Sequence, residues 1–237
     1  MRLAAITHRG LHRTENQDRV VVDGVVLASG NTQLAEFVLG RRGLLAVIDG
    51  MGGHPAGGVA AAVAADVIAS GHTRLRTPSD VESLVSAAND EIYATMRRIP
   101  GVGGMGATIA GVVVSSDTLL VFNVGDARVY LAGGGYLIQA SIDDRHTGAP
   151  HGPITQSLGG LDTHTPVDVH ISREPADTGR ILVASDGLFA GVPHETLALV
   201  MSRPPADAAR ALVDEALAAG GRDNISLGLI ELAGETT

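Results

Sequence analysis

The chain has 237 residues, and 17 basic against 26 acidic residues give it a formal net charge of −9. This length is enough for one substantial hydrophobic core, and no stretch has the composition of a linker, so residues 1–237 are predicted to form a single domain. The acidic balance without a Lys/Arg-rich run argues against nucleic-acid binding. Because the chain contains no cysteine, it has no disulfide, no thiolate metal ligand and no cysteine nucleophile.

The apolar stretch at residues 2–6 is too short for a secretory signal. No run elsewhere approaches the ~18 apolar residues that a membrane span needs. The sequence therefore predicts a cytoplasmic protein that does not enter a membrane.

The first part of the chain predicts strands followed by two helices. Apolar runs rich in β-branched residues are typical of strands and occur at 3–7, 19–27 and 43–48, with a loop or extended hairpin expected at 29–42. An Ala-rich helix is predicted over 57–70, with Val59, Val63 and Val67 along one face. A second helix is predicted from Pro78, before a capping box at 79–82, to the Pro-Gly pair at 100–101.

The second part predicts more strands than helices. Four short apolar runs separated by tight turns predict an antiparallel meander at 107–114, 118–124, 128–132 and 136–139. Beyond an irregular stretch at 140–165, strands are expected near 167–171, 180–184 and 225–232, and helices after Pro193 and over 206–219. Strands group with strands and helices with helices, which favours an α+β fold.

Several aspartates stand at the ends of the predicted strands. Asp49, Asp126, Asp186 and Asp223 each adjoin an apolar run and a glycine or asparagine, and Asp18 precedes another strand. A carboxylate at the end of a buried strand, followed by a glycine that frees the backbone to turn, suits a hard divalent cation.

Each aspartate also has a purely structural explanation. An Asp-Gly pair is a common turn, Asp126 could pair with Arg128, and Asp223 with Asn224 could cap the last strand. Taken together, however, the aspartates are predicted to converge at one rim and to form a shared metal centre.

Six segments in order along nearly the whole chain resemble the PPM family, the metal-dependent protein serine/threonine phosphatases of type 2C, in its compact bacterial form. The segments are Arg13 with Asn16-Gln17-Asp18, Asp49-Gly50-Met51-Gly52-Gly53-His54, Gly104-Met105-Gly106-Ala107-Thr108, Asn123-Val124-Gly125-Asp126-Ala127-Arg128, Ser185-Asp186-Gly187-Leu188 and Gly221-Arg222-Asp223-Asn224-Ile225-Ser226. The resemblance implies an αββα four-layer sandwich, in which two antiparallel sheets pack face to face between helices.

The resemblance also implies a role for each matching residue. Asp49 would bridge two Mn²⁺ or Mg²⁺ ions, the Gly50 carbonyl would bind one of them, and Asp186 and Asp223 would complete the shell of the other. Asp18 would hold metal-bound water. Two such ions would activate a water for hydrolysis without a covalent enzyme intermediate.

Two further roles follow from the same resemblance. Arg13 would bind phosphate oxygens through its guanidinium fork, although a solvated loop arginine is the alternative. Asp126 would join Asp186 at a third, weaker metal site.

The chain departs from the family pattern in three places. Met51 stands where some relatives have a histidine proposed as the general acid, and methionine cannot donate a proton; His54 is the nearest substitute, or an idle loop residue. The segment at 142–157 is too short and too rich in Gly and Pro for the usual helical flap, which predicts an open site and altered substrate choice. The loop at 29–42 is longer than usual.

The resemblance predicts a monomeric enzyme that dephosphorylates phosphoserine and phosphothreonine proteins and opposes a Ser/Thr kinase. One alternative is a catalytically weak module of the same fold that binds one dedicated phosphoprotein. Another is a phosphatase specialised for a single regulator, which the shortened flap would favour. The nine histidines show no zinc-binding pattern.

Overall fold

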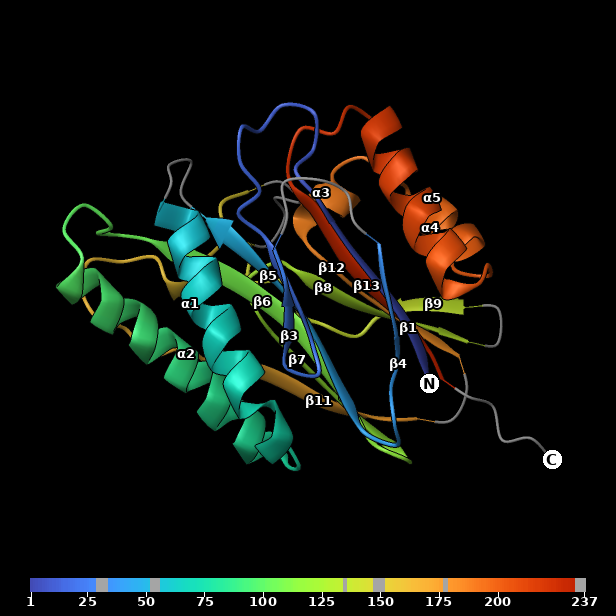
Figure 1. Cartoon of the computed structure of the whole chain (residues 1–237), viewed down its shortest axis with the longest axis horizontal. Coiled ribbons are helices and arrows are strands. Elements are labelled where there is room, and N and C mark those ends of the chain that lie inside the picture. The colour runs from blue at the N-terminus through green and yellow to red at the C-terminus, as the bar shows by residue number, and fades with distance from the viewer. Residues whose placement is uncertain (29–33, 52–55, 134–135, 147–151, 177–178, 233–237) are drawn as a thin grey trace.

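A computed structural model describes residues 1–28, 34–51, 56–133, 136–146, 152–176 and 179–232 of the chain. In these residues two antiparallel sheets pack face to face, and helices cover the outer side of each (Figure 1). The layering confirms the α+β prediction of a four-layer αββα sandwich. No helix in the described ranges is long and apolar enough to cross a membrane.

The first sheet has the strand order β4-β1-β13-β12-β8-β9. Its strands are β1 (Arg2–His8), β4 (Ala35–Val38), β8 (Arg128–Gly133), β9 (Tyr136–Gln139), β12 (Arg180–Ala184) and β13 (Ile225–Glu231). The second sheet has the order β11-β7-β6-β5-β2-β3, with β10 paired to β6. Its strands are β2 (Arg19–Val22), β3 (Val25–Leu27), β5 (Gly43–Met51), β6 (Gly106–Val114), β7 (Thr118–Val124), β10 (Leu158–Gly159) and β11 (His170–Pro175).

Two long helices cover the second sheet, and three shorter ones cover the first. The helices are α1 (Ala56–Gly71) and α2 (Pro78–Arg98) on one side, with the 3₁₀ turn His72–Arg74 between them, and α3 (Asp186–Phe189), α4 (His194–Val200) and α5 (Pro205–Ala218) on the other.

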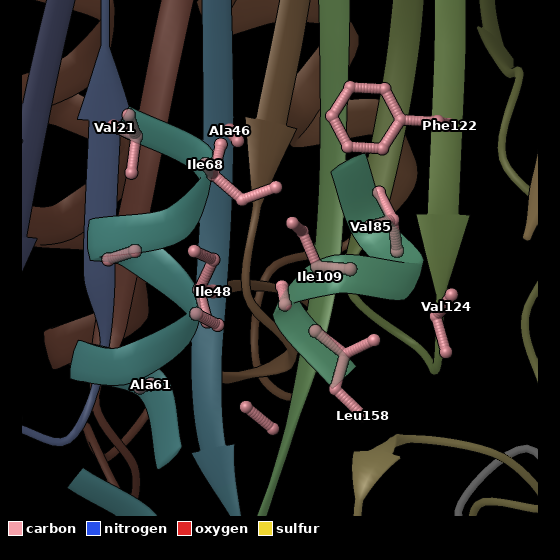
Figure 2. Packing of buried hydrophobic residues seen from close by; sticks show 14 of the residues in the cluster. Val21, Ala46, Ile48, Ala61, Ile68, Val85, Ile109, Phe122, Val124 and Leu158 are labelled. Carbon is pink, nitrogen blue, oxygen red and sulfur yellow. The ribbon is translucent and has the colours of Figure 1, made fainter. Parts of the chain in front are cut away.

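The core is divided into three layers because the central strands bury both faces. In β5, Leu45 and Val47 point between the sheets, whereas Leu44, Ala46 and Ile48 point toward α1 and α2. Figure 2 shows this helix-covered layer, where α1 presents Ala61 and Ile68. Strands buried on both faces read as continuous apolar runs, which is why the sequence predicted them readily.

The predicted four-strand meander at 107–139 is wrong only at its middle turn: the antiparallel pairs β6–β7 and β8–β9 form as expected, but β7 and β8 do not pair. Strand β7 pairs with β6 and β11, and β8 pairs with β9 and β12 in the other sheet. The chain crosses between the sheets at Gly125, whose φ of +98° lies in the region that favours glycine. Short turns predict neighbouring strands, but they do not reveal that a turn leads into a different sheet.

Other predictions need smaller corrections. The run at 19–27 is a hairpin, because Asp23 and Gly24 both have positive φ, at 45° and 82°, and turn the chain between β2 and β3. The predicted loop at 29–42 contains the edge strand β4, and the strand predicted at 167–171 lies at His170–Pro175. Residues 29–33 of that loop lie outside the described ranges. The four-residue α3 was not predicted.

Both long helices lie where the sequence predicted them, but two details differ. The capping box of α2 begins two residues earlier than expected, with Thr77 as N-cap: its side chain accepts from the Asp80 N–H, and the Asp80 carboxylate accepts from the Thr77 N–H. The fully buried face of α1 consists of alanines with Ile68, and the predicted valine stripe is only partly buried.

Candidate active site

The five predicted aspartates gather at one end of the two sheets. Asp49 lies near the end of β5 and Asp126 in the crossing after β7. Asp186 begins α3 directly after β12, and Asp223 precedes β13. Pairing of Arg19 with Ile48 sets Asp18, the residue before β2, beside the Asp49 end of β5. Antiparallel pairing thus brings together residues that are far apart in the sequence.

A cavity of about 240 Å³ opens at this end. The predicted residues on its wall are Arg13, Asp49, Gly50, Asp126, Asp186 and Asp223. A larger hollow of about 570 Å³ lies between α1 and α2, but none of the predicted residues lines it. Convergent ionisable groups rather than size make the smaller cavity the candidate active site.

Asp18 lies fully buried behind this cavity. Its Oδ2 accepts a hydrogen bond from the Ser185 hydroxyl at 2.9 Å, but its Oδ1 has no hydrogen-bond partner among the described residues. Burial, and the nearby charges of Asp186 and Asp223, raise the pKa of Asp18 to about 6 against the opposing effect of its hydrogen bonds. A buried acceptor without a donor is a place where ordered water is expected.

Asp49 and Asp186 are destabilised as anions in the same way. Burial, followed by the charges of Asp18 and Asp186, raises the pKa of Asp49 well above its ordinary value. Burial, followed by the charges of Asp126 and Asp223, raises the pKa of Asp186 to about 6. Carboxylates that repel one another in a partly desolvated cavity need either protons or cations to coexist.

Gly50 is required by close packing. A Cβ at this position would lie 2.4 Å from the Gly57 carbonyl oxygen and 2.8 Å from that of Gln17. Strand β5 therefore passes against the start of α1 and the loop before β2 with no room for a side chain. This explains the Asp-Gly pair independently of any ligand.

Arg13 lies on the cavity wall, where its guanidinium donates to Asp223 at 2.6 Å. This hydrogen bond, more than any other effect, raises the pKa of Arg13. Asn224 holds the loop that carries Arg13: its side-chain amide donates to the carbonyls of Arg9 and Glu15 at 2.8 and 2.9 Å. The Asp-Asn pair before β13 thus organises the loop, a role that the sequence alone did not suggest.

Arg145 is the cavity residue that sequence reasoning missed. Its guanidinium forms an ion pair with Asp126 and lies 3.5 Å from Asp186. The expected structural alternative for Asp126, a pair with Arg128, is wrong, because Arg128 binds Asp143 at 2.6 Å. The available signal was a lone arginine after two aspartates in the irregular segment between Asp126 and Asp186.

The carboxylates of the cavity form a donor set suited to divalent ions. Asp49, Asp186 and Asp223 supply carboxylate oxygens that Mn²⁺ or Mg²⁺ prefers, and Asp18 offers an unpartnered oxygen behind them. Among the described residues no three metal-ligating side chains are gathered tightly enough to hold an ion as they stand. In this arrangement Asp223 faces Arg13, and Asp126 faces Arg145. Asp126 and Asp186, the two carboxylates that the resemblance assigned to a third metal site, both already face the guanidinium of Arg145.

The segment in place of a flap still contributes to the site. Its described residues contain no helix, and Arg145 pairs as an isolated β-bridge with Ile154. Both residues line the cavity. Met51 lines it as well, as its position in the Asp-Gly-Met motif suggested, whereas His54 and residues 147–151 lie outside the described ranges. The prediction of an unusually open site stays a prediction.

Comparison with known proteins agrees with this fold. Residues 33–219 match the family model described as Protein phosphatase 2C, and the chain belongs to this family. The chain is 31% identical over 246 residues to the serine/threonine protein phosphatase PstP of Mycobacterium tuberculosis; the match covers 96% of this chain and 44% of that protein. It is 27% identical to the serine/threonine phosphatase Stp of Listeria monocytogenes, over 95% of this chain and 93% of that one.

A solved structure has a similar fold over nearly the whole length of this chain. The catalytic domain of PstP, crystallised in complex with two manganese ions, superposes with a TM-score of 0.79 at 27% identity, covering 98% of this chain and 99% of that one. The chain spans less than half the length of the full PstP relative. The likeness therefore concerns the catalytic domain of PstP.

Proposed function

We propose that this chain is a metal-dependent protein serine/threonine phosphatase that hydrolyses phosphoserine and phosphothreonine with two Mn²⁺ or Mg²⁺ ions. The observation that carries the proposal is the convergence of five aspartates, from five separate chain segments, on one cavity end of the sandwich. The membership in the protein phosphatase 2C family and the two manganese ions of the PstP catalytic domain support it.

When bound, divalent ions would supply Lewis-acid chemistry that activates a water toward phosphorus and offsets negative charge on the phosphate. Asp49 and the Gly50 carbonyl would hold one ion, and Asp49 with Asp186 and Asp223 would hold the other. Asp18 would orient the attacking water by accepting its hydrogen bond at the unpartnered Oδ1. No protein nucleophile is needed.

Arg13 would bind the substrate phosphate. Its guanidinium is exposed enough to reach a ligand. It donates a hydrogen bond to Asp223, and a phosphate oxygen would replace that carboxylate as the acceptor. Met51, on the cavity wall, cannot protonate the leaving serine or threonine oxygen, so we propose that water does so.

The proposed wider role is supported by the names of the relatives, which are serine/threonine phosphatases. A single catalytic domain of this kind would act as a cytoplasmic monomer on phosphoproteins and reverse the action of a Ser/Thr kinase. Every carboxylate that the family resemblance assigns to metal binding is present among the described residues. Nothing in the site therefore favours a catalytically silent binding module.

The test is phosphate release from a phosphothreonine peptide by purified protein with Mn²⁺, with Mg²⁺ and with a chelator. Activity should require metal and should vanish in Asp49→Asn. A folded protein that binds Mn²⁺ yet releases no phosphate from a panel of phosphopeptides would argue against a general phosphatase.

A further inference from the structure

The guanidinium of Arg145 lies where a third cation would be expected. It forms an ion pair with Asp126, which is almost completely buried, and the same Nη2 lies 3.5 Å from Asp186 Oδ2. These are the two carboxylates that would supply the protein ligands of a third metal ion. One cationic group of the protein therefore already faces both.

The position of Arg145 is built into the fold. Its Nη1 donates to the Gly152 carbonyl at 2.6 Å, which holds the guanidinium in place. The preceding residue, Asp144, accepts from the Gly125 N–H at 2.8 Å and from Gln156 at 3.0 Å, and it contacts His170 Nε2 at 2.8 Å. Gly125 is the residue just before Asp126, so the contacts that hold Arg145 also hold its partner.

No other described cation serves Asp126. The arginine closest in sequence, Arg128, donates through Nε and Nη2 to Asp143 and is engaged there. In the described part of the chain, the ion pairs of Asp126 involve Arg145 alone. An arginine stays protonated at any physiological pH, so its charge is permanent, whereas an ion held by two carboxylates dissociates.

We propose that Arg145 is a built-in replacement for the third metal ion, so that this chain binds two divalent ions and not three. The inference rests on the two-ion centre of the proposed function. Five carboxylates and the guanidiniums of Arg13 and Arg145 carry three net negative charges, which two divalent ions already exceed by one. A third divalent ion beside Arg145 would be repelled by the guanidinium, and it would find both carboxylates engaged.

The experiment counts Mn²⁺ ions per chain by equilibrium dialysis and elemental analysis, at Mn²⁺ up to about 1 mM, where weak carboxylate sites fill. Wild-type protein should hold two ions, and Arg145→Lys, which keeps the charge, should also hold two. Arg145→Gln leaves Asp126 and Asp186 without their cation and should gain a third ion.

Two further variants test whether a third ion needs the Asp126–Asp186 position or would bind beside any aspartate that has lost its arginine. The double variant Arg145→Gln/Asp126→Asn should return to two ions, because a ligand of the new site is gone. Arg128→Gln frees a different aspartate, Asp143, and should stay at two. Circular dichroism confirms that each counted variant is folded.

Each contrary result has a distinct meaning. Three ions in the wild type, or two in folded Arg145→Gln, would overturn the replacement by Arg145 and leave the two-ion centre intact. A third ion in Arg128→Gln would overturn it as well, since any freed aspartate would then suffice. A wild-type chain that binds no ion would contradict the metal centre and with it the proposed function.

Discussion

The two arginine–aspartate pairs of the cavity have the same chemistry and different surroundings. The side chains of Arg145 and Asp126 are 17% and 6% exposed, whereas those of Arg13 and Asp223 are 46% and 36% exposed. Separating a buried ion pair costs much free energy, because it leaves a buried charge without a partner. An exposed pair can exchange partners at little cost, because water solvates both charges. We infer that the Arg145 side of the site is structural and that the Arg13 side is open to exchange with a ligand.

The largest effect is expected from Asp49, a carboxylate of the same cavity that has no ion-pair partner among the described residues. Asp49→Asn should lower metal-dependent phosphate release by on the order of 10³-fold, because metal stabilisation of the transition state is worth several kcal/mol. The readout is turnover at saturating Mn²⁺, with circular dichroism as the control for folding. Activity near that of the wild type would remove the two-metal mechanism.

Removal of the buried guanidinium should have the next largest effect. Arg145→Gln should lower the free energy of unfolding of the metal-free protein by about 3 kcal/mol, because Asp126 is left buried and unpaired. Urea denaturation in chelator measures it.

The matched control for this variant is Arg98→Gln, which removes an exposed arginine paired with Glu91 and should change stability by less than about 1 kcal/mol. Equal losses in the two variants would contradict the contrast between buried and exposed pairs.

Asp18 extends the comparison to a buried carboxylate without an arginine. Its pKa is raised to about 6 in the folded protein, so the folded state binds a proton more tightly than the unfolded chain does. The stability that this proton provides is fully present below about pH 4, the pKa of an unfolded aspartate, and is lost as the pH rises through about 6.

Asp18→Asn removes this pH-dependent loss of stability, because asparagine does not ionise. At pH 7 in chelator the variant should be more stable than the wild type by about 2–3 kcal/mol, and the difference should shrink as the pH falls to 4. Thermal melting of both proteins across this range measures it. A difference that does not depend on pH would mean that Asp18 is not ionised in the folded protein at pH 7.

The smallest effect on stability is expected from Arg13→Ala, less than about 1 kcal/mol, because its pair with Asp223 is exposed. Its functional effect should be selective: loss of a charge-assisted contact to phosphate should raise KM about tenfold and leave kcat nearly unchanged. Steady-state kinetics with a phosphothreonine peptide decide the point. An unchanged KM would return Arg13 to the role of a solvated loop arginine.

The sequence was a good guide wherever the structure depends on local pattern. The helices α1, α2 and α5 and most of the long strands lie where the apolar runs predicted them, because strands buried on both faces and amphipathic helices have distinct periods. The aspartates stood out because each sits at the end of such a run. The turn at Asp23 and Gly24 was missed, because the apolar residues on both sides of it look like one continuous strand.

Tertiary structure decided which strands are neighbours and which charges meet. Strands β7 and β8 are adjacent in sequence but lie in different sheets, where β7 pairs with β6 and β11 and β8 pairs with β9 and β12. The partner of Asp126 is Arg145, which lies 19 residues away, and not Arg128, two residues away. The sequence by itself predicted which carboxylates gather at the cavity. The long-range pairing within two sheets decided which carboxylate faces which arginine, because electrostatic contacts depend on distance in space and not along the chain.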